Sequence, residues 1–194
     1  MPRVKPLSID EVPAEAKDDY ARFSNLFTDF ENQVPVYAHS AAGLKHIFGM
    51  AVDIKKAGNL PQRLVEIAVI TVSQTNSCPY CVAHHSAIAV DEGVDPETIN
   101  HILDPDPPGL SDVEKLVRNY AVQVTEQSWG IRDHVFEDLR KHFSESQIVE
   151  LTMRITLTGM FNRINQALQI DIEDWVMPAF EKRGLDVNSL PGPA

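Results

Sequence analysis

Both cysteines of the chain lie in one short segment, Ser77-Cys78-Pro79-Tyr80-Cys81-Val82-Ala83-His84-His85, together with two of its seven histidines. Two thiols three residues apart, beside two imidazoles, form a combination suited to chemistry at sulfur. The thiolate is the reactive form, whereas an ordinary cysteine of pKa about 8.5 is only slightly ionised at neutral pH. The segment therefore needs surroundings that favour the thiolate.

A helix through this segment would bring three of the four side chains together. Cys81 and His85 would be about 40° and one turn apart, and Cys78 and His85 about 20° apart. Side chains at i and i+4 have β-carbons about 5–6 Å apart, so His85 can assist Cys81 directly or through a water. His84 would lie about 120° from Cys78, which leaves it a supporting, interface or catalytic role.

Three features of such a helix favour a thiolate. The cysteines sit at its opening, where unpaired N–H groups and the helix dipole stabilise negative charge. An imidazole follows one turn later, and the second thiol can hydrogen-bond to the first. If Cys81 or Cys78 is oxidised to a sulfenic acid, its neighbour can condense with it to a disulfide. The pattern predicts a redox-active dithiol.

A carboxylate upstream completes the candidate set. Glu66 lies in the middle of a run that is apolar nearly all round, 64–72, where an unpaired charge is expensive to bury. Near an imidazole it could accept a proton. Alternatively, Arg63 at i−3 could pair with Glu66 at a helix rim. The similar Glu150 has Arg154 at i+4 and needs no such explanation.

The elements that must position these residues all read as helices. Apolar residues recur at helical spacing, and capping boxes begin at Ser111 and Ser144. No alternating strand pattern with hairpin turns occurs, although a buried strand is an alternative for 62–75. The fold class predicted is all-α, with helices over 17–31, 36–56, 62–75, 79–91, 111–126 and 147–160.

The chain length of 194 residues suits a single core. We expect an extended lead-in over 1–16, one helical domain over 17–180 with the Cys-x-x-Cys core at 60–93, and a tail over 181–194.

Two stretches of the sequence are alike, Leu64-Val65-Glu66-Ile67 and Ile148-Val149-Glu150-Leu151. They indicate either two related helical hairpins, the second without sulfur chemistry, or a chance match. In the shared register Asn162 stands opposite Cys78, Asn165 opposite Cys81 and Gln169 opposite His85.

Composition limits the partners and the compartment. A net charge of −11 argues against nucleic acid and anionic membrane surfaces. The longest apolar stretch, 64–72, is too short to span a bilayer, and the first residues do not resemble a secretory signal. We expect a cytoplasmic protein, where a Cys-x-x-Cys pair is more often catalytic or metal-binding than structural.

Glu66 is followed after eleven residues by the pattern Cys78-x-x-Cys81-x-x-x-His85. This spacing resembles the core motif of alkylhydroperoxidase-D-like proteins, which belong to the carboxymuconolactone decarboxylase superfamily. The chain resembles the peroxidase-related branch of that superfamily. Leu60-Pro61 and Asn119-Tyr120-Ala121 fit this resemblance. It implies an all-helical fold, a trimer or hexamer of identical chains, and reduction of a small organic hydroperoxide at the cost of a dithiol reductant, with no cofactor or metal.

The resemblance also implies roles. Cys81 would attack the peroxide oxygen, Cys78 would resolve the sulfenic acid, and His85 with Glu66 would form the proton relay. Tyr80 stands where the best-studied peroxidases carry a histidine, and tyrosine is a poor base at neutral pH. Tyr80 and His84 are possible supporting residues.

Other interpretations remain open. A zinc site could use Cys78, Cys81, His84 and His85 in a non-enzymatic binding or association module. A decarboxylase- or lyase-like enzyme of the same superfamily would use an imidazole without sulfur redox. The two cysteines could also simply be buried small side chains. His39 and His46 could line the same pocket, but surface positions are favoured for both.

Overall fold

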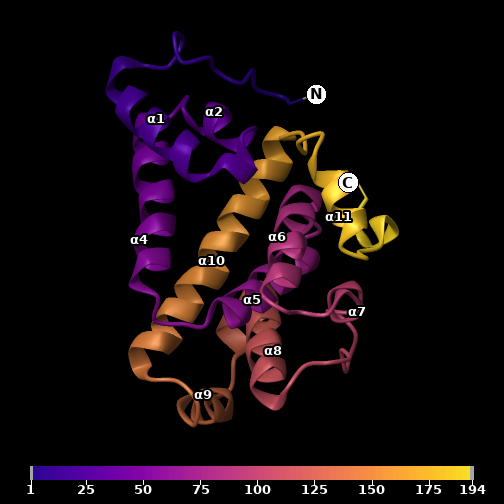
Figure 1. Ribbon diagram of the computed structural model, residues 1–194. Coiled ribbons are helices and arrows are strands. Elements are labelled where there is room, and N and C mark those ends of the chain that lie inside the picture. The colour runs from indigo at the N-terminus through magenta and orange to yellow at the C-terminus, as the bar shows by residue number, and fades with distance from the viewer. Residues whose placement is uncertain (1, 193–194) are drawn as a thin grey trace.

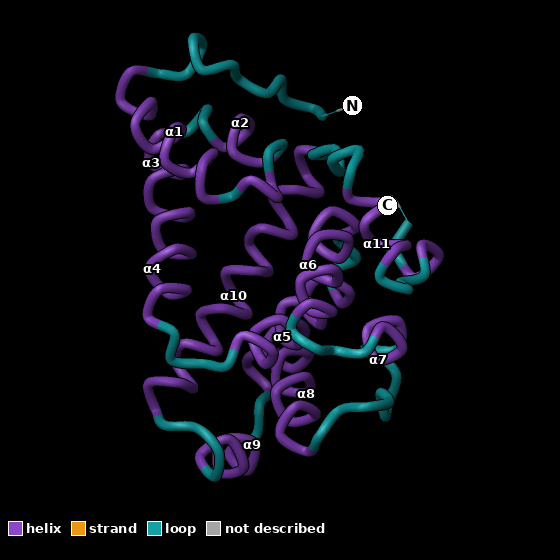
Figure 2. Tube along the Cα trace, in the orientation of Figure 1, coloured by secondary structure: helices purple, strands orange, loops and turns teal. Residues whose placement is uncertain are grey.

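The computed structural model describes residues 2–192, and within that range the chain consists of helices and loops without a strand (Figures 1 and 2). The all-α prediction is confirmed. Residue 1 and residues 193–194, the ends of the predicted lead-in and tail, lie outside the described residues. The main helices are α1 (Lys17–Leu26), α2 (Gln33–Tyr37), α3 (Ala41–Gly43), α4 (Gly49–Ala57), α5 (Gln62–Thr75), α6 (Pro79–Asp91), α7 (Pro96–Asn100), α8 (Asp112–Gln127), α9 (Asp133–Arg140), α10 (Glu145–Leu168) and α11 (Val176–Lys182).

The long helix α10 runs through the middle of the molecule, with α4 to one side of it and α5 and α6 to the other in the view of Figure 1. Helix α5 packs against α6, α8 and α10, so it is enclosed by other helices. Its residues 65–73 are all buried, as a helix that is apolar nearly all round requires. The strand alternative for this segment is wrong.

The helix that carries the sulfurs begins and ends where the sequence predicts. Cys78 is the N-cap residue of α6, and Pro79 occupies the first helical position, where its missing N–H is not needed. The chain leaves α6 through Gly93, whose φ of 83° favours glycine. Asp95 is the N-cap residue of the next helix, α7, and its side chain accepts a hydrogen bond from the Glu97 N–H.

The predicted helix over 36–56 is interrupted. Residues 33–37 form α2, and a new helix starts after Ser40, whose hydroxyl accepts from the Gly43 N–H. A five-residue π-helical segment, η3 (Leu44–Phe48), then leads into α4. Serine competes for backbone hydrogen bonds in this way and favours caps. Likewise the helix predicted over 17–31 stops at Leu26, followed by a 3-10 turn, η2 (Thr28–Phe30).

The prediction of a second helical hairpin is wrong, because α10 continues without a break through the positions that match the turn between α5 and α6. That turn contains Ser77 at a φ of 55°, followed by the N-cap Cys78 and Pro79. Proline at the position after Cys78 disfavours a helical residue before it. Arg163 occupies the matching position in α10 and retains its backbone N–H.

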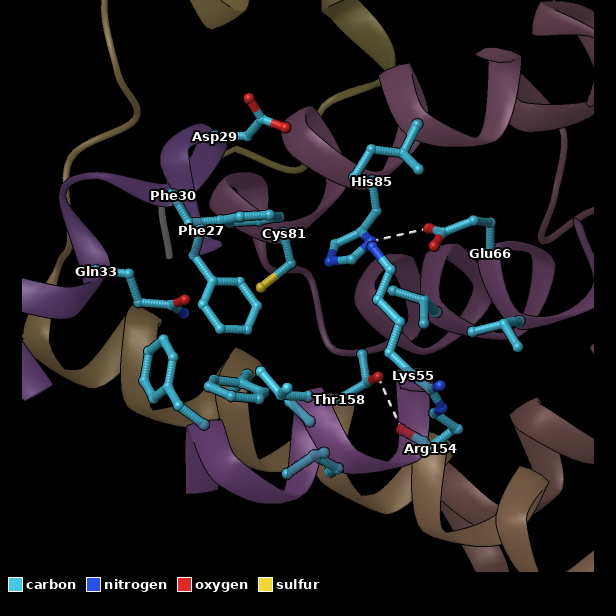
Figure 3. A pocket seen from close by; sticks show the side chains of 18 of the residues that line it. Phe27, Asp29, Phe30, Gln33, Lys55, Glu66, Cys81, His85, Arg154 and Thr158 are labelled. Atoms are coloured by element: carbon cyan, nitrogen blue, oxygen red, sulfur yellow. Dashed lines mark hydrogen bonds and ion pairs between the residues drawn. The ribbon is translucent and has the colours of Figure 1, made fainter. Parts of the chain in front are cut away.

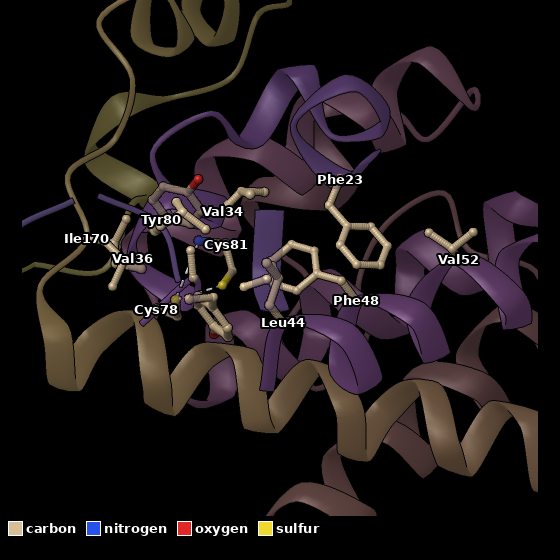
Figure 4. Packing of buried hydrophobic residues seen from close by; sticks show 14 residues of the cluster. Phe23, Val34, Val36, Leu44, Phe48, Val52, Cys78, Tyr80, Cys81 and Ile170 are labelled. Carbon is tan, nitrogen blue, oxygen red and sulfur yellow. Dashed lines mark hydrogen bonds between the residues drawn. The ribbon is translucent and has the colours of Figure 1, made fainter. Parts of the chain in front are cut away.

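The cysteines belong to a hydrophobic cluster formed with the N-terminal third of the chain (Figure 4). Phe23 and Phe48 pack at 5.5 Å between ring centroids, and Tyr80 lies in the same cluster. At the other end, Leu185 is buried against α5 and α7. The division into lead-in, domain and tail stays a prediction. Among residues 2–192, no helix has the length and apolarity to cross a membrane.

Helix α10 begins with the predicted capping box, in which Ser144 and Gln147 each bond the other's backbone N–H. Replacing Ser144 with Ala should lower the free energy of unfolding by about 1 kcal/mol, because an N–H of the first turn loses its acceptor. Urea unfolding would measure this. Thr156→Ala is the control, because this exposed residue lies in the middle of α10 and its hydroxyl bonds only backbone carbonyl oxygens of the same helix; an equal loss there would argue against capping.

Candidate active site

The two sulfur atoms lie together at the opening of α6. The Cys78 and Cys81 Sγ atoms are 2.9 Å apart, and the backbone N–H of Cys81 donates to Cys78 Sγ at 3.4 Å. Both are free thiols. Cys78 has no exposed surface and Cys81 is 5% exposed. The local cap conformation therefore brings the sulfurs into contact while burying them.

The two thiols differ in acidity. The pKa of Cys78 is lowered, first by the hydrogen bond from the Cys81 side chain, which together with backbone N–H donors outweighs burial. The pKa of Cys81 is raised well above its usual range, first by burial and then by its contact with Cys78. Of the two thiols, Cys78 is therefore the more readily ionised, and Cys81 holds its proton more tightly.

An oriented amide lies against Cys81. Asn165 Nδ2 donates to Cys81 Sγ at 3.4 Å. The other end of this amide, Oδ1, accepts from Gln33 Nε2 at 3.0 Å and from the Tyr37 hydroxyl at 3.2 Å, which fixes its direction. The sequence register placed Asn165 opposite Cys81, and the side chains are in contact; Asn162 likewise lies near Cys78 and lowers its pKa slightly.

His85 and Glu66 are in direct contact. His85 Nδ1 lies 2.8 Å from Glu66 Oε2, and Glu66 Oε1 accepts from Gln62 Nε2 at 2.5 Å. Glu66 is 3% exposed, so both of its oxygens are satisfied by side chains rather than by bulk water. The contact leaves His85 Nε2 free of this carboxylate and able to exchange a proton elsewhere.

The rim salt bridge considered for Glu66 is wrong. Arg63 Nε bonds Glu114 at 2.5 Å instead, and Glu114 belongs to the capping box of α8. The pairing expected for Glu150 is also absent among the described residues: Glu150 Oε2 accepts from Asn59 at 2.6 Å, and its other oxygen has no hydrogen-bond partner.

His84 has a carboxylate of its own, which sequence reasoning missed. Its Nε2 lies 2.7 Å from Glu173 Oε2, and both side chains are 1% exposed. The angle between these two groups does not suit a hydrogen bond, so the contact is one of charge and proximity. Its Nδ1 contacts the Tyr80 carbonyl oxygen at 2.7 Å. The Tyr80 hydroxyl donates to Glu173 Oε1 at 2.9 Å, as does the Asn32 N–H at 2.8 Å.

Burial acts on this network in two directions. It raises the pKa of Tyr80 far above its usual range, with the Glu173 charge adding to the effect. Burial also opposes ionisation of Glu173, but the close contact with the His84 imidazole and the hydrogen bond from the Asn32 N–H outweigh it, and the pKa of Glu173 is lowered. Tyr80 thus acts as a hydrogen-bond donor and not as an acid or base. Glu173 lies in a loop after α10 with no periodic pattern, so no sequence signal pointed to it.

A cavity of about 440 Å³ opens onto one sulfur only (Figure 3). Cys81, His85 and Glu66 line it, whereas Cys78 and His84 do not. Four phenylalanines form part of its wall: Phe27, Phe30, Phe48 and Phe161. Helices α4 and α10 contribute Val52, Lys55, Lys56, Arg154 and Leu157. His39 and His46 are exposed and do not line it, as predicted.

The zinc interpretation requires four side chains to converge, and they do not. His84 points to Glu173 and His85 to Glu66. Within residues 2–192 no group of three or more His, Cys, Asp or Glu side chains is arranged to hold a metal ion.

The same region of the chain carries the similarity to known proteins. The model of the carboxymuconolactone decarboxylase family matches residues 42–106, which include all four predicted catalytic residues. The uncharacterized protein YdfG of Bacillus subtilis (strain 168) is 26% identical over 141 residues, covering 70% of this chain and 93% of that protein.

Solved structures share the fold. An alkylhydroperoxidase AhpD core protein, an uncharacterized peroxidase-related protein from Ralstonia eutropha JMP134, superposes with a TM-score of 0.78 at 19% identity, covering 90% of this chain and 94% of that one. The debrominase Bmp8, crystallised with 2,3,4-tribromopyrrole, gives 0.74 at 17% identity, covering 93% and 96%. The match to the carboxymuconolactone decarboxylase family covers residues 42–106, and the solved structures show that the chain has the helical fold of AhpD-like proteins.

The hydrogen bond between the two sulfurs predicts that the pKa of Cys78 depends on the side chain at position 81. Cys81→Ala should raise the pKa of Cys78, because the thiolate loses its nearest donor; Cys81→Ser, which keeps an O–H donor, should raise it less. The ultraviolet absorbance of the thiolate as a function of pH reports both. An unchanged first ionisation in Cys81→Ala would show that the backbone, and not the thiol pair, sets the acidity.

Proposed function

We propose that this protein is a thiol-dependent oxidoreductase that reduces an organic hydroperoxide with the Cys78–Cys81 dithiol. One observation carries the proposal: Cys81 reaches the cavity while Cys78 Sγ lies 2.9 Å behind it, shielded from solvent. An electrophile in the cavity meets one sulfur, and the second is already in place to complete a disulfide.

The proposed reaction proceeds in two steps, oxidation of Cys81 and then formation of the disulfide with Cys78. A proton passes across the sulfur pair to Cys78, and the Cys81 thiolate attacks the terminal peroxide oxygen. The O–O bond breaks, the alcohol leaves with a proton, and Cys81 becomes a sulfenic acid. Cys78 then attacks Cys81 Sγ, water leaves, and a disulfide forms. Two thiols thus give two electrons to the hydroperoxide, and an external dithiol restores them.

The contact between His85 and Glu66 supports a proton relay. Glu66 fixes Nδ1 of the imidazole, so Nε2 is the nitrogen directed toward other groups of the cavity. One turn separates His85 from Cys81 on α6, and both line the cavity. We assign to His85 the exchange of protons with the sulfur pair and the leaving alkoxide, with Glu66 as its positioning residue.

A second candidate reaction uses the same dithiol. The aromatic wall of the cavity and the fold shared with the debrominase Bmp8 favour reductive removal of a halogen from a halogenated ring. In that reaction an aryl bromide and two thiols give the unsubstituted ring, hydrogen bromide and the disulfide. The two candidates differ in the electrophile and not in the sulfur chemistry.

Assembly and compartment are part of the proposal. We propose a homo-oligomer, a trimer or hexamer by the resemblance; Val149 and Met153, one turn apart on α10, leave apolar surface exposed. We also propose a cytoplasmic, reducing compartment, because the catalytic cycle needs both sulfurs returned to the thiol state.

Exposure to cumene hydroperoxide should remove both titratable thiols per chain and link Cys78 to Cys81, and Cys81→Ser should abolish turnover. Thiol titration and mass spectrometry of peptides measure the loss of thiols and the disulfide. The rate of alcohol formation measures turnover. Incubation with 2,3,4-tribromopyrrole, with release of bromide as the measurement, tests the alternative reaction, reductive removal of a halogen. Thiols untouched by either reagent would favour a decarboxylase- or lyase-like enzyme without sulfur redox.

The relay predicts a pH-dependent effect of Glu66→Gln, which keeps the size of the side chain. Thiol oxidation should slow by roughly tenfold to a hundredfold at neutral pH, and by much less at high pH, where thiolate forms without assistance. Rapid-mixing measurements over a pH range would show this. Glu114→Gln is the matched control, since Glu114 pairs with Arg63. A loss for Glu66→Gln that is equal at every pH would make Glu66 structural.

A further inference from the structure

The cavity has two chemically different sides. Lys55 and Arg154 lie on one side of the drawn residues and Asp29 on the opposite side, with Cys81 and His85 between them (Figure 3). The remaining wall is mostly apolar. The chain as a whole carries a charge of −11, so a group of cations beside one cavity runs against its overall composition.

Arg154 is the unusual member of this group. Its Nε is buried without a hydrogen-bond partner, and within residues 2–192 its guanidinium forms no ion pair. Neither nearby carboxylate forms an ion pair with it: Glu66 contacts Gln62 and His85, and Glu150 accepts from Asn59 through Oε2, while its Oε1 has no hydrogen-bond partner. Burial lowers the pKa of Arg154, and Glu150 and Glu66 offset this only in part.

A buried N–H without an acceptor is costly, and native proteins seldom leave such a donor unsatisfied; Arg154 is half-buried, with its Nε in this position. Its planar fork of N–H groups matches a carboxylate, which it can bind through two parallel hydrogen bonds. Lys55 and Lys56 are exposed at the same cavity and add attraction for an anion that approaches from solvent.

We propose that the substrate is an amphipathic organic acid, whose carboxylate binds Arg154 and whose apolar body fills the cavity so that the reacting group meets Cys81. This rests on the proposed function for the reaction itself, but the binding preference stands independently of it. Lys55 assists at the same side of the cavity. The acid group supplies orientation and takes no part in the chemistry.

Binding tests this without any turnover. Titration calorimetry on the reduced protein compares 4-isopropylbenzoate with its neutral isostere, 4-isopropylbenzamide. The carboxylate should bind about tenfold more tightly or better, as charge-assisted hydrogen bonds allow. Arg154→Gln should abolish this preference and leave amide binding unchanged, which also shows that the cavity is intact. Arg163→Gln, an exposed arginine on the same helix, should retain the preference.

Turnover supplies the second readout. With cumene hydroperoxide and its para-carboxylate analogue, Arg154→Gln should lower kcat/KM for the carboxylate substrate at least tenfold more than for cumene hydroperoxide, because only the first has an acid group for Arg154 to orient. Equal binding of benzoate and benzamide by the native protein, or an equal effect of Arg163→Gln, would overturn the inference. If the carboxylate preference is observed but no hydroperoxide oxidises the thiols, the proposed function fails and the acid-binding inference stands.

Discussion

The structure depends on one backbone arrangement, the reversal of the chain between α5 and α6. Ser77 adopts a positive φ, Cys78 follows in an extended conformation, and Pro79 starts the helix. Only because Cys78 caps the helix instead of continuing it does its sulfur turn back toward the N–H and the sulfur of Cys81. The acidity of Cys78 and the burial of its sulfur both follow from this turn.

Two adjacent histidines meet two different carboxylates because successive residues of a helix point in different directions. His85 contacts Glu66 of α5 at the edge of the cavity, and His84 contacts Glu173 of the C-terminal segment in the interior. The first pair is available to a substrate. The second is sealed and, through Tyr80, ties the first turn of α6 to the loop that follows α10. One dipeptide thereby places one imidazole at the cavity and the other in the interior.

Helix α10 complements the sulfur helix without repeating it. It contributes amides where α6 has thiols, and Asn165 directs its N–H toward Cys81 because Gln33 and Tyr37 occupy its oxygen. About three turns earlier in the same helix, α10 supplies Arg154 to the cavity that Cys81 lines. A single long helix thus contributes both a hydrogen-bond donor to the Cys81 sulfur and a cation elsewhere in the cavity wall.

The sequence by itself determined the helices with strong local signals, namely α5, α6 and the capping boxes, because periodicity, Pro79 and the cap residues act within one turn. It also determined that His85 and Cys81 share a helix face, since this follows from spacing alone. Only the tertiary structure decided which carboxylate each imidazole meets, that Arg63 pairs with Glu114, that the cavity opens onto Cys81 and not Cys78, and that the Nε of Arg154 is buried without a hydrogen-bond partner. Those contacts join residues up to about a hundred positions apart in the chain, and their choice depends on how helices pack and which charges water can still reach.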